Sequence, residues 1–477
     1  MIDASAISRM LDARLRKVAR VHFVGIGGSG MAGIAEVLLN LGYTVSGSDT
    51  KESPAVLRLR QMGAQVRIGH TAEAVSGVDV VVRSSAIGVE NPEIKAALEQ
   101  RIPVIRRAEM LAELMRFRFG IAIAGTHGKT TTTSLTATVL AAGDLDPTYV
   151  IGGRLKSSGS NAALGTGPYL VAEADESDAS FLHLTPMLSV VTNVDPDHME
   201  TYGHDPARLH RSYVEFLQQL PFYGLALLCA DDPDLMRLST EIGRPFATYG
   251  LSETADYQAR NLRTEGADSL FDFCARDQAP VPVRLALPGR HNVQNATAAL
   301  AVSCELGLNP QQVAPSLAGF KGIGRRCELL GEVALPSGGQ AMVIDDYGHH
   351  PRELEATLAA VQAAWPERRC VLVFQPHRYT RTRDLFEDFA RVLSQAPVLL
   401  LTEVYPAGEA PIPQADGRSL ARSVRLRGGA EPVFVAELDE LGPQLGRLAR
   451  DGDLLLFMGA GDISGYAQGV AQRGLPE

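Results

Sequence analysis

Cysteines are few in this sequence, and their spacing excludes the commonest cysteine-based structures. The five cysteines are widely scattered, and no two of them stand in a Cys-x-x-Cys spacing. We therefore expect no zinc site built on paired cysteines. An odd, scattered set of thiols favours a reducing compartment over a disulfide framework, which predicts a cytoplasmic protein.

Long apolar runs and basic blocks are also missing. The N-terminal stretch MIDASAISRMLDARLRKVAR is interrupted by Asp and Arg, so it lacks the apolar core of a signal peptide. Runs such as DLLLFMGAG are too short to cross a bilayer. The formal net charge is −10, and no aromatic residues are interleaved with Lys or Arg, so we expect neither a membrane nor a nucleic-acid partner. Small phosphate ligands remain possible, because a few backbone N–H groups and one Lys are enough to hold them.

Short apolar runs alternate with helical stretches along most of the chain. This alternation is typical of parallel sheets covered by helices on both faces, and it predicts an α/β protein. A chain of 477 residues is long enough for about three domains. The segment FKGIGRR (320–326) resembles a linker, and the strand–helix alternation restarts after it. We therefore predict three units, at residues 1–117, 118–325 and 326–477.

The first of two glycine-rich loops, residues 25–30, reads GIGGSG. It follows an expected strand and opens an expected helix, with Gly25, Gly27 and Gly30 in the Gly-x-Gly-x-x-Gly spacing. Such a turn allows the backbone to approach a pyrophosphate at the helix N-terminus. Asp49 ends the next strand, where an acid that binds ribose is expected. The motif alone indicates a nucleotide diphosphate rather than NAD, and three glycines can also form a simple tight turn.

The second glycine-rich loop, residues 125–131, reads GTHGKTT. Its backbone N–H groups can surround a phosphate, Lys129 can reach the β- and γ-phosphate oxygens, and Thr130 offers a hydroxyl to Mg²⁺. The loop departs from the usual spacing of triphosphate-binding loops, because isoleucine stands where their first glycine would be. A shorter Gly-x-x-Gly-Lys-Thr form remains.

Four motifs in order, GTHGKTT, EADESDASF, TNVDPDHM and LPGRHNVQNATAA, resemble those of the Mur ligases. These are ATP-dependent, amide-forming enzymes of peptidoglycan synthesis. The resemblance implies a Rossmann-like N-terminal domain, a central P-loop ATPase-like α/β domain and a C-terminal Rossmann-like α/β domain. Within the family, GIGGSGM and DDYGHHP (345–351) resemble the members that join L-alanine to the carboxylate of UDP-N-acetylmuramate through an acyl phosphate. One glycine-rich loop would then hold the UDP-sugar and the other ATP.

The resemblance also implies a Mg²⁺ site at two strand ends. It selects Glu173 and His198 as ligands, beside the hydroxyl of Thr130. Whether the neighbouring Asp175 and Glu176 belong to the site or to a solvated loop is left open by the sequence. Several related ligases carry a carbamoylated lysine on the next helix, but this sequence has no lysine from position 198 to position 220.

Most nucleotide contacts are expected within or near these motifs. For ATP the candidates are Gly125, Thr126, His127, Gly128, Lys129, Thr130, Thr131, Asn193, His291, Asn295, Arg326 and Asp346. For the UDP-substrate they are Gly25, Gly27, Gly28, Ser29, Gly30, Asp49, His70, Ser84 and Arg107. Asn295 and His291 can equally belong to a capped helix start, and serine at a strand end often only closes a turn. The predicted catalytic groups are Lys129, His198, Arg326 and His349.

In the third unit, DDYGHHP and FQPHRYTRTRD follow apolar strands and offer a pocket for a small zwitterion. Its candidate residues are Tyr347, His349, His377, Arg378 and Arg381. A carboxylate favours the forked guanidinium of Arg, so Arg381 is the first choice for that contact and Arg378 the second. His349 can accept a proton from the alanine ammonium group.

Three other functions are compatible with parts of the sequence. The nearest is a related ligase that recycles a murein tripeptide onto UDP-N-acetylmuramate. An NAD-dependent oxidoreductase would use only the first glycine-rich loop and Asp49. A non-catalytic sensor of UDP-precursors would not need Lys129, Glu173 and His198. We expect a monomer or a weak homodimer.

Overall fold

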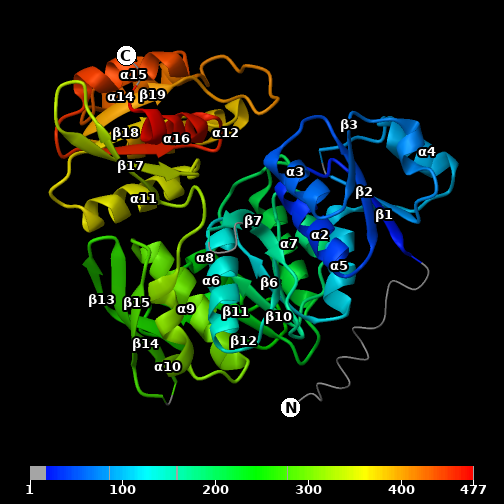
Figure 1. Cartoon of the computed structure of the whole chain (residues 1–477). Coiled ribbons are helices and arrows are strands. Elements are labelled where there is room, and N and C mark those ends of the chain that lie inside the picture. Colours follow the sequence, from blue (N-terminus) through cyan, green and yellow to red (C-terminus); the bar gives the residue numbers. More distant parts are fainter. Residues whose placement is uncertain (1–17, 85, 157–159, 277, 476–477) are drawn as a thin grey trace. The chain divides into compact units, whose positions relative to one another are not determined.

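The computed structural model describes residues 18–84, 86–156, 160–276 and 278–475. Internal contacts divide the chain into two compact units (Figure 1). Of the described residues, unit 1 holds 18–260 with Asp272–Val283 and Gln294–Lys321, and unit 2 holds Asn261–Phe271, Arg284–Val293 and 322–475. The three-unit boundaries at 117/118 and 325/326 stay a prediction.

The first sheet of unit 1 has five parallel strands in the order β3-β2-β1-β4-β5. The apolar residues of its central strands β1 and β4, most of them Val, are buried, as a sheet covered on both faces requires. The strands are β1 (Arg20–Val24), β2 (Thr44–Asp49), β3 (Gln65–Ile68), β4 (Val80–Arg83) and β5 (Val104–Arg106). The helices that accompany them are α2 (Ser29–Asn40), α3 (Pro54–Gln61), α4 (Pro92–Glu99) and α5 (Arg107–Arg116), with the 3-10 turn η1 (Ala72–Val75).

The second sheet has ten strands in the order β15-β14-β13-β12-β11-β10-β6-β9-β7-β8. Strands β6, β9, β10, β11 and β12 pair in parallel, so their carboxyl ends meet at one edge. The strands are β6 (Phe119–Ala124), β7 (Thr148–Leu155), β8 (Ser160–Ala163), β9 (Tyr169–Glu173), β10 (Leu188–Val191), β11 (Leu225–Cys229), β12 (Phe246–Gly250), β13 (Tyr257–Glu265), β14 (Asp268–Ala275) and β15 (Val281–Leu285). The helices are α6 (Lys129–Ala142), α7 (Pro206–Gln218), α8 (Pro233–Leu238), α9 (Arg290–Glu305) and α10 (Pro310–Val313), with the 3-10 turns η2 (Ser180–His183) and η3 (Ala314–Gly319).

The five-stranded sheet and strands β6 to β12 of the ten-stranded sheet share one hydrophobic core, which fixes their glycine-rich loops relative to each other. Strands β13, β14 and β15 lie partly in unit 2. Helix α2, which begins at the first glycine-rich loop, packs on β7 and β8 of the second sheet. The approach is close, because a Cβ atom on Gly33 would lie 3.3 Å from side-chain atoms of both Val150 and Ala162.

The sheet of unit 2 has six strands in the order β16-β17-β21-β18-β19-β20. All neighbours pair in parallel except β16, an antiparallel edge strand that the sequence pattern did not predict. The strands are β16 (Glu328–Ala334), β17 (Gln340–Asp346), β18 (Cys370–Phe374), β19 (Val398–Thr402), β20 (Val433–Val435) and β21 (Leu454–Met458). The helices are α11 (Pro351–Ala364), α12 (Tyr379–Asp384), α13 (Phe386–Leu393), α14 (Gly417–Arg427), α15 (Leu441–Leu448) and α16 (Ile463–Arg473), with the 3-10 turn η4 (Leu438–Glu440).

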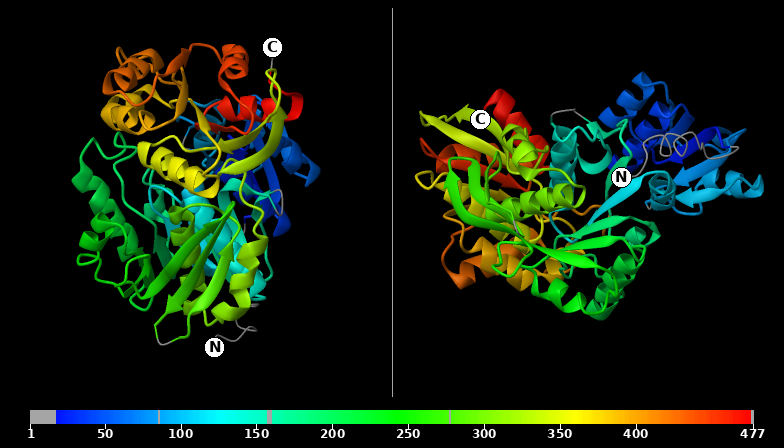
Figure 2. Two further views of the ribbon diagram at one scale, coloured as in Figure 1. Left: turned by 90° about the vertical axis from the view of Figure 1, so that its left-hand side faces the viewer. Right: turned by 90° about the horizontal axis from the view of Figure 1, so that it is seen from below.

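Alternate residues of this third sheet face two separate cores. The ribbon views show helices along both sides of the sheet (Figures 1 and 2). Leu372 and Phe374 pack with α11, α13 and α14, whereas Val371 and Val373 pack with α15 and α16. Burial on both faces explains why these strands read as continuous apolar runs in the sequence. Across the described part of the chain, no helix is both long enough and apolar enough to span a bilayer.

Candidate active site

The second glycine-rich loop joins β6 to α6 through two backbone positions that require glycine. Gly125 has a φ of 127°, and a Cβ atom there would lie 2.0 Å from Oγ1 of Thr192. Gly128 caps α6 in the left-handed region with a φ of 83°. The loop therefore turns tightly over the end of β10 and presents the N-terminus of α6, where backbone N–H groups favour an anion.

Lys129 is the first residue of α6, and its ammonium group is held at the carboxyl ends of β6 and β9. Nζ donates to the carbonyl oxygens of Gly125 at 2.7 Å and Thr126 at 3.1 Å, and to Oε2 of Glu176 at 2.6 Å. The side chains of Lys129 and Glu176 are only 15% and 2% exposed. A buried cation thus lies within the loop predicted to bind a triphosphate.

Asp175 and Glu176, which follow β9, interact with Lys129, whereas Asp178 is exposed. Burial raises the pKa of Glu176 to about 7, against the opposing attraction of Lys129. Burial also acts to raise the pKa of Asp175, but the charges of Lys129 and Arg107 outweigh it and lower that pKa. The charges of Glu176 and Asp175 in turn outweigh desolvation and raise the pKa of Lys129.

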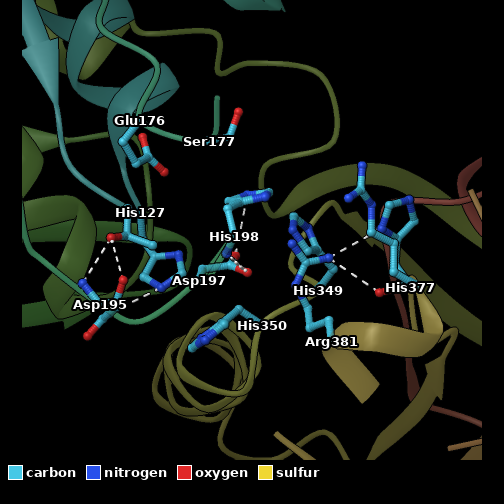
Figure 3. Close-up of polar contacts among 12 residues, drawn as sticks. His127, Glu176, Ser177, Asp195, Asp197, His198, His349, His350, His377 and Arg381 are labelled. Carbon is cyan, nitrogen blue, oxygen red and sulfur yellow. Dashed lines mark hydrogen bonds and ion pairs between the residues drawn. The ribbon is translucent and has the colours of Figure 1, made fainter. Parts of the chain in front are cut away.

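The side chain of Asn193, which is expected near the phosphates, holds the backbone of the second glycine-rich loop. Its Oδ1 accepts from the backbone N of His127 at 2.8 Å, and its Nδ2 donates to the carbonyl oxygen of the same residue at 3.1 Å. Nε2 of His127 lies 3.2 Å from Oδ2 of Asp195, which is 2% exposed (Figure 3). Sequence reasoning did not select Asp195, although its position just after β10 was the signal that could have found it.

The three predicted metal ligands, Thr130, Glu173 and His198, all lie in unit 1. Oε1 of Glu173 accepts from the backbone N of Gly152 at 2.6 Å. His198 adopts a φ of 52°, and its Nε2 lies 3.6 Å from Oδ2 of Asp197. Among the residues that the structure describes, no group of three or more His, Cys, Asp or Glu side chains forms a ready metal cage. Any magnesium ion would therefore need further ligands from water or phosphate.

The first glycine-rich loop is tied to the ends of β2 and β4. The backbone N of Gly25 donates to the carbonyl oxygen of Ser48 at 2.9 Å, and that of Gly27 donates to Oδ2 of Asp49 at 2.8 Å. Ser84 follows β4, and its backbone N donates to the carbonyl oxygen of Val24 at 3.1 Å. Gly28 is the N-cap of α2, and the side chain of Ser29 lies outside the described part of the structure.

Arg107 connects the surroundings of the two loops. A Cβ atom on Gly30 would lie 3.0 Å from Nη1 of Arg107, so the guanidinium group lies directly against the start of α2. Nη2 of the same side chain is 3.5 Å from Oδ2 of Asp175, next to the partner of Lys129. The predicted UDP and ATP sites thus share one arginine.

The predicted amino-acid pocket of unit 2 is assembled at the ends of β17 and β18. The ring of His349 lies 5.2 Å from that of Tyr347 and 5.6 Å from that of His377. Nη1 of Arg381 lies 3.3 Å from Nδ1 of His377 (Figure 3). Tyr405, which the sequence did not indicate, stacks on His377 with ring centroids 5.6 Å apart.

The electrostatics of this pocket favour an anion. Burial, together with the charges of Arg381 and Arg378, lowers the pKa of His377 to about 4, so its ring is neutral near pH 7. Arg378 has a φ of 71°, and its Nη1 lies 3.9 Å from Oε1 of Glu409. Arg381 is buried, and its Nη1 also lies 3.3 Å from the carbonyl oxygen of His377. That Arg381 is the first choice for a carboxylate ligand and Arg378 the second stays a prediction.

Three residues predicted to bind ATP, Asp346, Arg326 and His291, lie near this pocket within unit 2. Oδ2 and Oδ1 of Asp346 accept from the backbone N atoms of Cys327 and Gly348, both at 2.7 Å. Burial raises the pKa of Asp346 to about 6, although Arg326 opposes the rise. Burial and the charge of Arg326 lower the pKa of His291 to about 4.

The remaining ATP candidates lie on or beside the second loop. Thr126 accepts through Oγ1 from the backbone N of Asp195 at 2.9 Å. Thr130 and Thr131 occupy the buried first turn of α6. Oδ1 of Asn295 accepts from Oγ1 of Thr132 at 3.1 Å, and a Cβ atom on Gly128 would lie 2.8 Å from the same Oδ1.

Comparisons with known proteins agree with this arrangement over nearly the whole chain. Models of the Mur ligase family match in three parts: the catalytic domain at residues 20–119, the middle domain at 123–303 and the glutamate ligase domain at 325–461. A UDP-N-acetylmuramate–L-alanine ligase of Halorhodospira halophila is 60% identical over 449 residues, which cover 94% of this chain and 92% of that protein.

Solved structures show the same architecture. A UDP-N-acetylmuramate–alanine ligase from Thermotoga maritima superposes with a TM-score of 0.78 at 30% identity, covering 95% of this chain and 98% of that one. A murein peptide ligase from Psychrobacter arcticus has a TM-score of 0.69 at 24% identity, covering 95% and 98%, and so shows the fold alone. With its three matched domains and these relatives, the chain belongs to the Mur ligase family.

Proposed function

We propose that this protein joins L-alanine to the carboxylate of UDP-N-acetylmuramate at the expense of ATP, as a step in the synthesis of peptidoglycan precursors. Family membership and a 60% identical relative with that named activity support the proposal. The five cysteines are unpaired, which fits a reducing compartment, so we propose that the enzyme works in the cytoplasm.

The observation that carries the proposal is the position of Arg107 in unit 1. Its guanidinium lies against Gly30 of the first loop, and it also faces Asp175 beside the Lys129–Glu176 pair. A diphosphate at the first loop and a triphosphate at the second would therefore be neighbours. This is the arrangement needed when the acid carried by one nucleotide is phosphorylated by the other.

The reaction requires two steps, because a carboxylate oxygen is a poor leaving group. First, a carboxylate oxygen of the muramyl group attacks the γ-phosphorus of ATP, the bond from that phosphorus to the β–γ bridging oxygen breaks, and ADP leaves. Second, the alanine nitrogen attacks the carbonyl carbon, the bond from carbon to the phosphate oxygen breaks, and inorganic phosphate leaves. The first step depends chiefly on positioned positive charge, which Lys129 and the N-terminus of α6 supply.

Mg²⁺ fits the donor set around the second loop. Glu173, Thr130 and the neighbouring acidic residues offer hard oxygen ligands, to which His198 adds an imidazole. The described side chains include no cluster of three or more His, Cys, Asp or Glu that could hold a metal ion. Mg²⁺ does not need one, because it usually keeps several water ligands and binds phosphate oxygens. When bound, the ion would neutralise charge on the phosphate oxygens. We propose Glu173, His198 and Thr130 as its protein ligands.

The pocket of unit 2 would hold alanine. Arg381 would bind its carboxylate, with Arg378, Tyr347 and His377 at the edges of the pocket. Nδ1 of His349 lies 3.1 Å from the carbonyl oxygen of Tyr347, and since a carbonyl only accepts, Nδ1 carries the hydrogen. Nε2 is then the nitrogen of the neutral ring without a hydrogen, and it would take the proton from the alanine ammonium group.

The other predicted nucleotide contacts remain part of the proposal. For ATP they are Gly125, Thr126, His127, Gly128, Thr131, Asn193, His291, Asn295, Arg326 and Asp346. For the UDP-sugar they are Gly25, Gly27, Gly28, Ser29, Gly30, Asp49, His70 and Ser84. Of these, Asn193 and Asp346 would act through the backbone they support, and His291 would act as a neutral ring.

Phosphate release tests the proposal directly. Purified protein with Mg²⁺, ATP and UDP-N-acetylmuramate should release phosphate when L-alanine is added, and only weakly with other amino acids. Release with the murein tripeptide but not with alanine would instead establish the recycling ligase. Tight NADH binding without phosphate release would favour an oxidoreductase. Binding of UDP-precursors with no turnover of ATP would favour a sensor.

The proton-accepting role of His349 has a separate test. A His349→Gln variant should lose turnover near neutral pH, where the alanine amine is still protonated, and should regain part of it at higher pH, where alanine loses that proton without a base. Wild-type turnover at every pH would exclude this role and leave the rest of the proposal intact.

A further inference from the structure

A buried chain of hydrogen bonds runs through the five-stranded sheet and ends at His70. It starts from Glu93 in the first turn of α4, whose side chain is fully buried. Oε2 of Glu93 accepts from Oγ of Ser48 at 2.6 Å, and Oε1 accepts from the backbone N of Thr71 at 3.2 Å. Nε2 of His22 lies 3.3 Å from Oε2. Of these groups, only His70 is among the proposed contacts of the UDP-sugar, and the two reaction steps use none of them.

The carboxyl group of Glu93 is ionised and acts only as an acceptor. Burial acts to raise its pKa, but hydrogen bonds from His22 and Ser48 outweigh burial and hold the pKa below its usual value. A hydroxyl group has a single hydrogen to donate. The hydrogen of Ser48 is therefore committed to Glu93.

The bond from Ser48 to Glu93 determines which ring nitrogen of His70 carries the hydrogen. Nδ1 of His70 lies 2.9 Å from Oγ of Ser48, and that oxygen has no second hydrogen to offer. Nδ1 must therefore carry the hydrogen and donate it to Ser48. In the neutral ring Nε2 is then a hydrogen-bond acceptor, and the side chain of His70 is 15% exposed.

The position of His70 in the sheet matches the base end of a nucleotide. The first loop follows β1, Asp49 ends β2, and His70 follows β3, and these three strands are neighbours in the order β3-β2-β1. In such sheets the pyrophosphate lies at the first loop and the acid at the end of the second strand binds ribose. A nucleoside that continues in this direction brings its base to His70.

We propose that Glu93, acting through Ser48, is a positioning residue that presents His70 as an acceptor to the ring N–H of uracil, and so selects uridine over cytidine nucleotides. This inference rests on the proposed use of a UDP-sugar. At the position where uracil has an N3–H donor, cytosine has an unprotonated N3 acceptor. The acceptor nitrogen of His70 would therefore hydrogen-bond the first base and repel the second.

The chain offers a matched pair of variants for the test. Ser48→Ala removes the hydroxyl that joins Glu93 to His70. The direct distance from Nδ1 of His70 to Oε2 of Glu93, 3.6 Å, is too long to replace that hydrogen bond. Ser46→Ala, two residues earlier on the same face of β2, removes the bond from its Oγ to Nδ1 of His22, 2.8 Å long, on the other side of Glu93. Both variants delete one partly or fully buried hydroxyl, so a merely structural effect should appear in both.

Two measurements on the full chain then decide whether Ser48 sets the tautomer of His70 and the preference for UDP over CDP. Nitrogen-15 NMR at pH 8, with the His70 signals assigned from a His70→Gln variant, should show hydrogen on Nδ1 in the wild type and in Ser46→Ala but not in Ser48→Ala. Calorimetry should show UDP bound roughly tenfold or more tightly than CDP by the wild type and Ser46→Ala, a ratio that corresponds to about one hydrogen bond. In Ser48→Ala that preference should fall to about threefold or less.

The outcomes separate this inference from the proposed function. Normal UDP binding and alanine ligation, with hydrogen on Nε2 of His70 in the wild type or with an undiminished UDP preference in Ser48→Ala, would overturn the inference alone. Failure to bind either UDP or CDP would overturn the proposed function as well. The wild-type NMR result decides the tautomer even if Ser48→Ala does not fold.

Discussion

Nζ of Lys129 lies 2.6 Å from Oε2 of Glu176, and both side chains are largely removed from solvent. The pair joins the second glycine-rich loop to the acidic segment after β9. The ammonium group also donates to two loop carbonyl oxygens, so the loop and its charged residue form one hydrogen-bonded unit. We expect phosphate oxygens to replace the carboxylate as the partner of Lys129 when ATP binds.

Replacing Lys129 by Met should remove most of the ligase activity without unfolding the protein. The loss should be about 10²–10³-fold in kcat, the cost typical of deleting one positioned electrostatic donor. Lys95→Met provides the control, because that lysine is 53% exposed and pairs with Glu90 on the surface. Equal activity of the two variants in a phosphate-release assay would show that Lys129 has no role in the phosphoryl-transfer step.

The Lys129–Glu176 pair should show energetic coupling in a double-mutant cycle. Glu176→Gln and Lys129→Met should each lower the free energy of unfolding, because each leaves the other buried group without its partner. The double variant should lose less than the sum of the two, with a coupling of about 1–3 kcal/mol. Urea unfolding of the wild type, the two single variants and the double variant measures this coupling energy. Additive losses would mean that the two charges do not support each other.

Arg381→Lys should weaken alanine binding selectively. Lysine keeps the charge but loses the forked geometry that suits a carboxylate, so the KM for alanine should rise about tenfold or more while the KM for ATP stays nearly constant. Arg383 lies on the same helix, is 48% exposed and pairs with Asp384, so Arg383→Lys is the matched control. A similar small effect in both variants would place the alanine carboxylate elsewhere.

Asp346 should make stability depend on pH between about 4 and 6. Burial raises its pKa from 3.8 to about 6 in the folded state, so the folded protein binds the proton more tightly than the unfolded chain. The free energy of unfolding should therefore fall as pH rises through this window, by at most about 3 kcal/mol from this group.

The measurement compares unfolding of the wild type and Asp346→Asn from pH 4.5 to 7.5. The difference in unfolding free energy between them should shift in favour of the variant as pH rises, and the exposed Asp384→Asn should show no such trend. A pH-independent difference for Asp346→Asn would show that its folded-state pKa is not raised.

Sequence reasoning succeeded where local pattern and position carry the information. Buried strands reveal themselves as apolar runs, and both glycine-rich loops were found because glycine stands between a strand and a helix. The carboxyl ends of parallel strands meet at one edge, which is why the acidic motif after β9 was expected near the loop that holds Lys129.

Pairing between side chains far apart in the sequence could not be predicted in this way. Glu176 and Lys129 are separated by 47 positions, and composition does not say which of several adjacent carboxylates faces the lysine. The stacking of Tyr405 on His377 and the bond from Glu93 to Ser48, 45 positions away, likewise depend on strand order and register. The short edge strand β16, ELLGEVA, has a glycine and two acids that hid its pairing with β17.

The most direct test follows oxygen atoms from the muramyl carboxylate. With oxygen-18 in both carboxyl oxygens of UDP-N-acetylmuramate, together with ATP, Mg²⁺ and alanine, each turnover should deliver one labelled oxygen to inorganic phosphate, because that oxygen attacks the γ-phosphorus. Amide product accompanied by phosphate without the label would contradict an acyl phosphate and, with it, the central role of two phosphate-binding loops that bring an acid and a triphosphate together.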